Sequence, residues 1–293
     1  MSERIRFFGE HRCRLGESPV WDDRCGRLWW IDAIAGRILS AGIDGAVISD
    51  WVFDQPVGSI ALSESGLIAA LADGFYAVNV ETGQATPLWK PEPSPDLRFN
   101  DGKTDRTGGF LSGQLERVAG EAPAAALYRL DGDGRGTLLV DGLRLTNAIC
   151  FSPDGATIYF ADSLEGVIRR HAYDEARGTI GDRLGEIDCH SFGSGPDGAT
   201  IDADGNLWVA LVLAQAIACI APDGTLLRQI ALPIPYPSCP AFGGPDRDVL
   251  YVSSISDSEH RLKSDHPDAG RILAIEGLGV RGVPEARWPG SHP

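Results

Sequence analysis

The chain has 293 residues, 43% of them hydrophobic, which is enough for one large domain or two ordinary ones. Asp and Glu (41) outnumber Lys and Arg (26), so the formal net charge is −15. Such a charge repels phosphate backbones and anionic membrane surfaces, which argues against a nucleic-acid or membrane role and makes cations the better ligands.

The N-terminal stretch, MSERIRFFGEH, lacks the apolar core of a signal peptide, and no run of about 18 apolar residues follows it. We therefore expect a cytoplasmic protein, and no obligate protein partner is evident. The six cysteines are scattered without a C-x-x-C pair, and the six histidines form no H-E-x-x-H motif. This distribution favours reduced thiols and gives little support to nitrogen or sulfur metal ligands.

Six β-rich runs recur along the chain, and most are opened by a turn glycine. Most are followed by a second strand-like run, such as GRILSAGI from Gly36 and GRILAIEG from Gly270. In chain order the six runs are GRLWWID (26–32), GLIAALAD (66–73), GGFLSG (108–113), GATIYFAD (155–162), GNLWVAL (205–211) and DVLYVSS (248–254).

The starts of these runs lie about 40–50 residues apart, which is the period of a four-stranded propeller blade. No convincing amphipathic helix of about 12 or more residues interrupts the pattern. A large β-sandwich is the competing all-β architecture, but the regular recurrence favours radial repetition around a channel. We predict a single all-β domain over residues 1–293, a six-bladed β-propeller.

A shorter strand-like piece precedes each run across a turn: SPVW, SIAL, GKTD, AICF, ATID and CPAF. In a propeller these pieces would be the innermost strands, so the residues just before them should surround the channel at one end. Those residues are Glu17, Gly58, the Asn100–Asp101 pair, Asn147, Asp197 and Ser238.

Four of these positions, Glu17, Asn100, Asn147 and Asp197, carry side-chain oxygens that suit a hard divalent cation. Two carboxylates with one or two amides leave coordination positions for water or substrate. The sequence therefore predicts an open cation site at one end of the channel.

Each of these residues also has a simpler interpretation. The tripeptide PDG occurs at 153, 196 and 222 and is a generic turn, so Asp197 could be a turn residue like Asp154 or Asp223. Its place directly before an inner strand separates it from the other two. Asn100 could be a loop-capping amide.

Several longer segments carry a resemblance to a known family: LGESPVW (15–21), RFNDGKTDRTGGFLSG (98–113), LTNAICFSPDG (145–155), YFADS (159–163), PDGATIDADGNLWVA (196–210), AFGGPD (241–246) and PDAGRILAIEGLGVRG (267–282). Together they span nearly the whole chain. The sequence resembles the gluconolactonase family that includes senescence marker protein 30, also called regucalcin.

This resemblance implies a six-bladed propeller in which Glu17, Asn147 and Asp197 hold one divalent metal ion, Ca, Zn, Mn or Mg. It suggests that Asp197 is also the catalytic general base, a role that a carboxylate beside the metal could fill. It further implies that an R-x-N motif, here Arg98 and Asn100, binds substrate oxygens. Arg98 could instead be a surface cation that pairs with a neighbouring aspartate.

Two departures from the family pattern fall where substrate is selected. The stretch GQLERVAG has Leu115 where relatives commonly have Met, and Glu116 stands earlier than the family's acidic substrate contact. The segment LVLAQA from Leu211 replaces paired glycines. We keep Glu116 as a candidate substrate-binding residue, and the particular sugar is left open.

The predicted function is metal-dependent hydrolysis of a small sugar lactone to the aldonic acid. A metal ion can polarise the lactone carbonyl and activate a water molecule, and Arg98 suits substrate hydroxyls or the developing oxyanion. No G-x-S-x-G motif supports a serine hydrolase. The alternatives are a calcium-binding regulatory propeller without turnover, and an esterase or organophosphate hydrolase of related fold.

Overall fold

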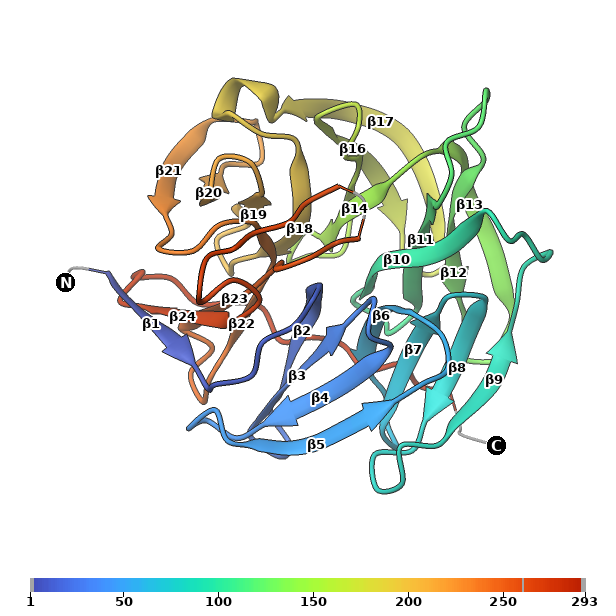
Figure 1. The fold of residues 1–293 in the computed structure, drawn as a ribbon. Coiled ribbons are helices and arrows are strands. Elements are labelled where there is room, and N and C mark those ends of the chain that lie inside the picture. The colour runs from blue at the N-terminus through green and yellow to red at the C-terminus, as the bar shows by residue number, and fades with distance from the viewer. Residues whose placement is uncertain (1–2, 260, 291–293) are drawn as a thin grey trace.

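The computed structural model describes residues 3–259 and 261–290. Within these residues the strands form six four-stranded antiparallel sheets arranged around a central axis (Figure 1). This arrangement confirms the predicted six-bladed β-propeller and excludes the sandwich. Among the described residues, no helix has the length and apolar character that crossing a membrane requires.

The strands follow the chain from blade to blade. The first blade holds β2 (Gly16–Asp22), β3 (Arg27–Asp32), β4 (Arg37–Ala41) and β5 (Val47–Val52), and the second holds β6 (Val57–Leu62), β7 (Leu67–Leu71), β8 (Gly74–Val78) and β9 (Ala85–Trp89). The third holds β10 (Leu97–Thr104), β11 (Phe110–Glu116), β12 (Ala125–Leu130) and β13 (Gly136–Leu143). The fourth holds β14 (Thr146–Phe151), β15 (Thr157–Asp162), β16 (Val167–Asp174) and β17 (Thr179–Asp188). A short 3-10 helix, η1 (His190–Phe192), leads into the fifth, which holds β18 (Pro196–Ile201), β19 (Leu207–Leu211), β20 (Ala216–Ile220) and β21 (Leu226–Ala231).

The sixth blade is built from both ends of the chain. It holds β22 (Pro237–Gly243), β23 (Val249–Ser254) and β24 (Ile272–Glu276), and the N-terminal strand β1 (Arg4–Phe8) is its outermost strand. β1 pairs antiparallel with β24, from Arg4 opposite Glu276 to Phe8 opposite Ile272. This pairing closes the ring, because the strand that completes the last blade precedes the first blade in sequence.

The six innermost strands β2, β6, β10, β14, β18 and β22 contact one another in a closed circle around the axis. All of them except β10 are buried nearly throughout, as in VGSIAL of β6 and TNAICF of β14, because both of their faces pack against neighbouring blades. The outermost strands β5 and β17 expose many of their side chains. This gradient in burial explains why the inner strands read as short apolar runs.

The segment after β24 crosses one end of the channel. Its Glu285 pairs with Lys103 of β10 at 3.2 Å, and Arg287 pairs with Asp22 of β2. Trp288 is 1% exposed, and its indole N–H donates to the carbonyl of Asp131 at 3.1 Å. The C-terminal segment therefore covers this end.

Candidate active site

Every innermost strand carries a β-bulge near its start. The pairing with the second strand of the blade shifts register at Glu17/Val20, Val57/Ser59, Phe99/Gly102, Asn147/Cys150, Pro196/Ala199 and Pro237/Pro240. A bulge interrupts the alternation of a strand and re-aims its side chains. All six positions picked out from the sequence lie at or within these bulges, which is the structural basis of the register they share.

The three PDG tripeptides differ in their conformation. Gly155 and Gly224, which follow Asp154 and Asp223, have φ of 72° and 93° and lie in turns. Gly198, which follows Asp197, lies within β18, and a Cβ atom there would clash with the Cys239 side chain. The glycine beside Asp197 is therefore needed for close packing between the fifth and sixth blades, and not for a turn.

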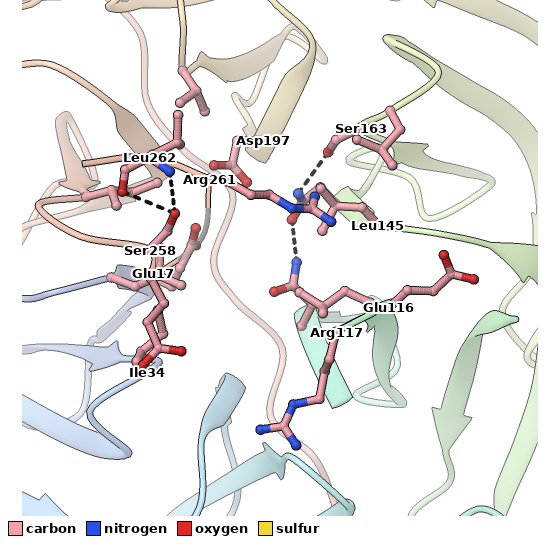
Figure 2. A pocket seen from close by; sticks show the side chains of 18 of the residues that line it. Glu17, Ile34, Glu116, Arg117, Leu145, Ser163, Asp197, Ser258, Arg261 and Leu262 are labelled. Carbon is pink, nitrogen blue, oxygen red and sulfur yellow. Dashed lines mark hydrogen bonds between the residues drawn. The ribbon is translucent and has the colours of Figure 1, made fainter. Parts of the chain in front are cut away.

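The six predicted site residues, Glu17, Arg98, Asn100, Glu116, Asn147 and Asp197, all line one cavity of about 740 Å³. Figure 2 shows Glu17 and Asp197 entering this cavity from different sides of the ring. Glu17 belongs to β2 and Asp197 to β18, so residues that are 180 positions apart share one site. The bulges at the strand starts place both carboxylates at the open end of the channel.

A hydrogen-bond network fixes the orientation of the Asn147 amide. Its Nδ2 donates to Ser163 Oγ at 2.8 Å, and Ser163 in turn donates to the carbonyl of Pro196 at 2.7 Å (Figure 2). Because the Ser163 proton is used, this hydroxyl must accept from Asn147. Asn147 Oδ1 accepts from Asn100 Nδ2 at 3.0 Å and retains a second lone pair. The amide oxygen of Asn147 is therefore turned away from Ser163 and available to a ligand.

Three carboxylates gather at this end of the channel. Burial raises the pKa of Glu17 well above its ordinary value, and the charges of Asp197 and Asp101 raise it further. Burial, and then the charge of Asp101, likewise raise the pKa of Asp197. Asp101 itself accepts from Gly102 N–H at 2.8 Å and Ile149 N–H at 2.9 Å, and burial raises its pKa to about 6. The charged forms of Glu17 and Asp197 are destabilised together, which a bound cation would relieve.

Arg98 forms no ion pair among the described residues, in contrast to the surface-pair alternative. One of its guanidinium nitrogens donates to the Phe99 carbonyl at 2.8 Å and to Asn100 Oδ1 at 3.3 Å. Burial lowers its pKa to about 10, and the positive charge of Arg117 adds to this effect. At this pKa the guanidinium is charged at neutral pH, and its remaining N–H groups can reach a ligand in the cavity.

Glu116 lines the cavity but is already paired. It is 4% exposed, and its carboxylate binds Arg144 at 2.7 Å and accepts from the Ala124 N–H at 2.9 Å. Figure 2 shows its side chain turned away from Glu17 and Asp197. A substrate contact by Glu116 would have to compete with Arg144, which lies in the segment between β13 and β14 that connects the third blade to the fourth.

Two buried aspartates at the ends of second strands support the site, and sequence reasoning did not assign them this role. Asp162 accepts from the N–H groups of Arg144 at 2.7 Å and Leu145 at 3.3 Å, just ahead of Asn147. Asp32 binds the backbone ahead of Glu17 in the same way, through Arg14 and Leu15. The signal in the sequence was the Asp that ends both WWID and YFAD, because it recurs at the same position of two blades.

Other candidate nucleophiles do not fit the site. Cys150 and Cys239 lie on inner strands, and both are buried free thiols. Burial raises the pKa of Cys150 to about 12 and that of Cys239 well above its ordinary value, so neither is a thiolate at neutral pH.

The donor set suits a hard divalent cation. Glu17 and Asp197 supply carboxylate oxygens, and Asn147 supplies an amide oxygen whose direction Ser163 fixes. Among the described residues, no three His, Cys, Asp or Glu side chains form a metal-binding group. The candidate site is a mixed one of two carboxylates and an amide, with its remaining coordination open to the cavity.

Comparison with known proteins identifies the family of the chain. The model of the SMP-30/Gluconolactonase/LRE-like region matches residues 15–256. The chain is 32% identical to regucalcin of Xenopus laevis, over 94% of this chain and 95% of that protein. It is 31% identical to 6-deoxy-6-sulfogluconolactonase of Pseudomonas putida, over 99% and 100% of the two chains.

A solved structure extends the likeness to three dimensions. The crystal structure of a calcium-binding protein, regucalcin, from Agrobacterium tumefaciens has a TM-score of 0.89 to this chain at 28% identity, covering 97% of each. The match thus includes all six blades and the strands that carry the candidate site. The chain belongs to the SMP-30/gluconolactonase family.

Proposed function

We propose that the protein is a divalent-metal-dependent lactonase that opens a sugar lactone to its hydroxy acid. The observation that carries this proposal is the pair of partly buried carboxylates, Glu17 and Asp197, which line one cavity together with Asn147 and Arg98 and whose pKa values are both raised. Relatives named as sugar lactonases support the reaction class.

The roles of the residues follow from their chemistry. A divalent cation, when bound by Glu17, Asn147 and Asp197, would supply Lewis acidity to the lactone carbonyl. Asp197, a carboxylate beside the bound cation, would accept the proton of the attacking water. Arg98 would donate to the oxyanion or to ring hydroxyls. Asn100 would hold Asn147 and Arg98 in place through its two hydrogen bonds.

The test is acid release from a panel of aldonolactones, followed in a pH-stat with added divalent cation and again with excess chelator. We expect turnover that the chelator abolishes and that cation restores, whereas full activity in metal-free protein would overturn the mechanism. A related structure is described as a calcium-binding protein, so a calcium-binding role without turnover is the second candidate. Cation binding by calorimetry without hydrolysis of any lactone would favour it.

A further inference from the structure

Large apolar side chains are exposed around one side of the candidate active site. Val118, Leu164 and Leu213 are 68%, 55% and 67% exposed, and all three line the cavity. Each follows the second strand of its blade, β11, β15 or β19, so they occupy equivalent turns of three successive blades. Exposed apolar groups that gather in a cavity mark a ligand surface more often than a packing defect.

We call these three residues, together with Leu145 and Val212, the apolar wall. Leu145 lies just ahead of β14 and Val212 just after β19, and both are partly exposed in the same cavity. The wall therefore spans the third to the fifth blade, on the side of the cavity that carries Asn147 and Asp197.

Several polar side chains beside the apolar wall are already committed to the protein. Ser163 donates to the Pro196 carbonyl at 2.7 Å, and Ser194 donates to the Gly195 carbonyl at 2.9 Å while accepting from Leu213 N–H at 3.0 Å. Glu116 is paired with Arg144. A hydroxyl placed against Leu164 and Leu213 would lose water without gaining a comparable partner from these groups, which is costly.

The size of the cavity also favours a ligand that extends beyond one lactone ring. Its volume of about 740 Å³ lies within the range of pockets that hold ligands much larger than one lactone ring. With the ring at Asp197 and Arg98, space remains beside the wall. An apolar substituent would fill that space and cover Leu164 and Leu213.

We infer that the substrate is a lactone that carries an alkyl or aryl substituent, which lies against the apolar wall. The inference rests on the proposed lactonase reaction and departs from it in the substrate, because the ring carries an apolar substituent where a sugar lactone carries hydroxyls. In the reaction, the oxygen of water adds to the carbonyl carbon and the ring C–O bond breaks. The departing alkoxide takes up a proton, so the product is a hydroxy acid that carries the same substituent.

The experiment uses the full chain with added divalent cation and compares γ-butyrolactone, γ-hexalactone, γ-nonalactone and D-glucono-δ-lactone in a pH-stat. We expect kcat/KM to rise roughly fourfold for each methylene that the wall covers, the value of one buried methylene group. The double variant Leu164→Asn/Leu213→Asn should lower the ratio of kcat/KM for γ-nonalactone to kcat/KM for γ-butyrolactone by roughly 10-fold or more. The matched control is Leu227→Asn, an exposed leucine of β21 outside the cavity, which should change neither.

Two results would overturn the inference: kcat/KM that is independent of chain length, or a double variant that loses activity equally on γ-butyrolactone and γ-nonalactone. Calorimetric binding of γ-nonalactone to the Asp197→Asn protein separates this inference from the proposed function. Binding that is tighter than for γ-butyrolactone and is weakened by the double variant supports the apolar wall, even if no lactone is turned over. If no lactone is turned over, that result would then contradict the proposed lactonase function but not the apolar wall. Equal binding of the two lactones would contradict the role of the apolar wall in binding substrate.

Discussion

Replacing Asp197 by Asn should lower activity without lowering stability, because the charge of this carboxylate opposes folding. Burial and the neighbouring Asp101 raise its folded pKa, so the folded state holds this proton more tightly than the unfolded chain does. This contribution to stability is present at low pH and is lost as pH rises from the ordinary carboxyl pKa through the raised one. At neutral pH the metal-free variant should therefore melt at the same temperature as the parent or higher. Its kcat/KM should fall by roughly 10³-fold, the scale of losing a general base.

The control is Asp154→Ala, in the same PDG context. Asp154 is exposed, and it accepts from Ser152 Oγ at 2.5 Å and Ala156 N–H at 3.1 Å within a turn. Its loss should cost less than about 1 kcal/mol, a drop in melting temperature of no more than about 4 °C, with kcat/KM within about twofold of the parent. Lactone kinetics and thermal melts in chelator measure both effects. Equal loss of activity in the two variants, or normal turnover by Asp197→Asn, would refute the assignment.

Three further outcomes are expected. Arg98→Ala should lower kcat/KM by roughly 10²-fold, while its cation affinity, measured by calorimetry, stays near that of the parent. Arg98→Lys should recover part of the loss in kcat/KM. Weakened cation binding by Arg98→Ala would indicate a structural role for Arg98 instead. Cation binding should release protons and should tighten as pH rises above the ordinary carboxyl pKa, because the raised pKa values of Glu17 and Asp197 leave protons for the cation to displace. Calorimetry in buffers of different ionisation enthalpy would detect this release, and an affinity that does not depend on pH would contradict it. Ser163→Ala should weaken cation binding, measured by calorimetry, roughly 10- to 100-fold, because the Asn147 amide loses the acceptor that orients it. An unchanged cation affinity would show that Asn147 is held by other contacts.

The blade pattern and the shared position of the candidate site residues could be predicted from the chain, because both depend on local repetition. A turn followed by a short apolar run specifies one strand, and the repeat places the same strand at the same radius in each blade. GATIYFAD became β15, GNLWVAL became β19, and Asp197 fell at the bulge of β18. Gly198, which follows Asp197, lies within β18 and packs against Cys239, whereas the glycines of the other two PDG tripeptides lie in turns.

Contacts between distant segments were decided only by the tertiary structure. The N-terminal strand β1 gives no sign of its partner, because its pairing with β24 joins residues about 270 positions apart. From the sequence, the carboxylate of Glu116 could be interpreted as free for substrate, but in the structure it pairs with Arg144 of the segment that connects the third blade to the fourth. Ser163 took on a role only when its hydroxyl bridged Asn147 and Pro196.

The apolar wall shows most clearly the difference between what the sequence predicts locally and what tertiary contacts decide. Leu164 and Leu213 each read as an ordinary residue in a surface turn, and nothing nearby in sequence distinguishes them. Ring closure brings the equivalent turns of successive blades to one face, so side chains about 50 positions apart become neighbours around one cavity. The sequence by itself determined the propeller and the shared position of the candidate oxygen ligands, because these repeat locally. Only the tertiary structure decided which side chains can contact a substrate, because their hydrogen-bond and ion-pair partners come from distant parts of the chain.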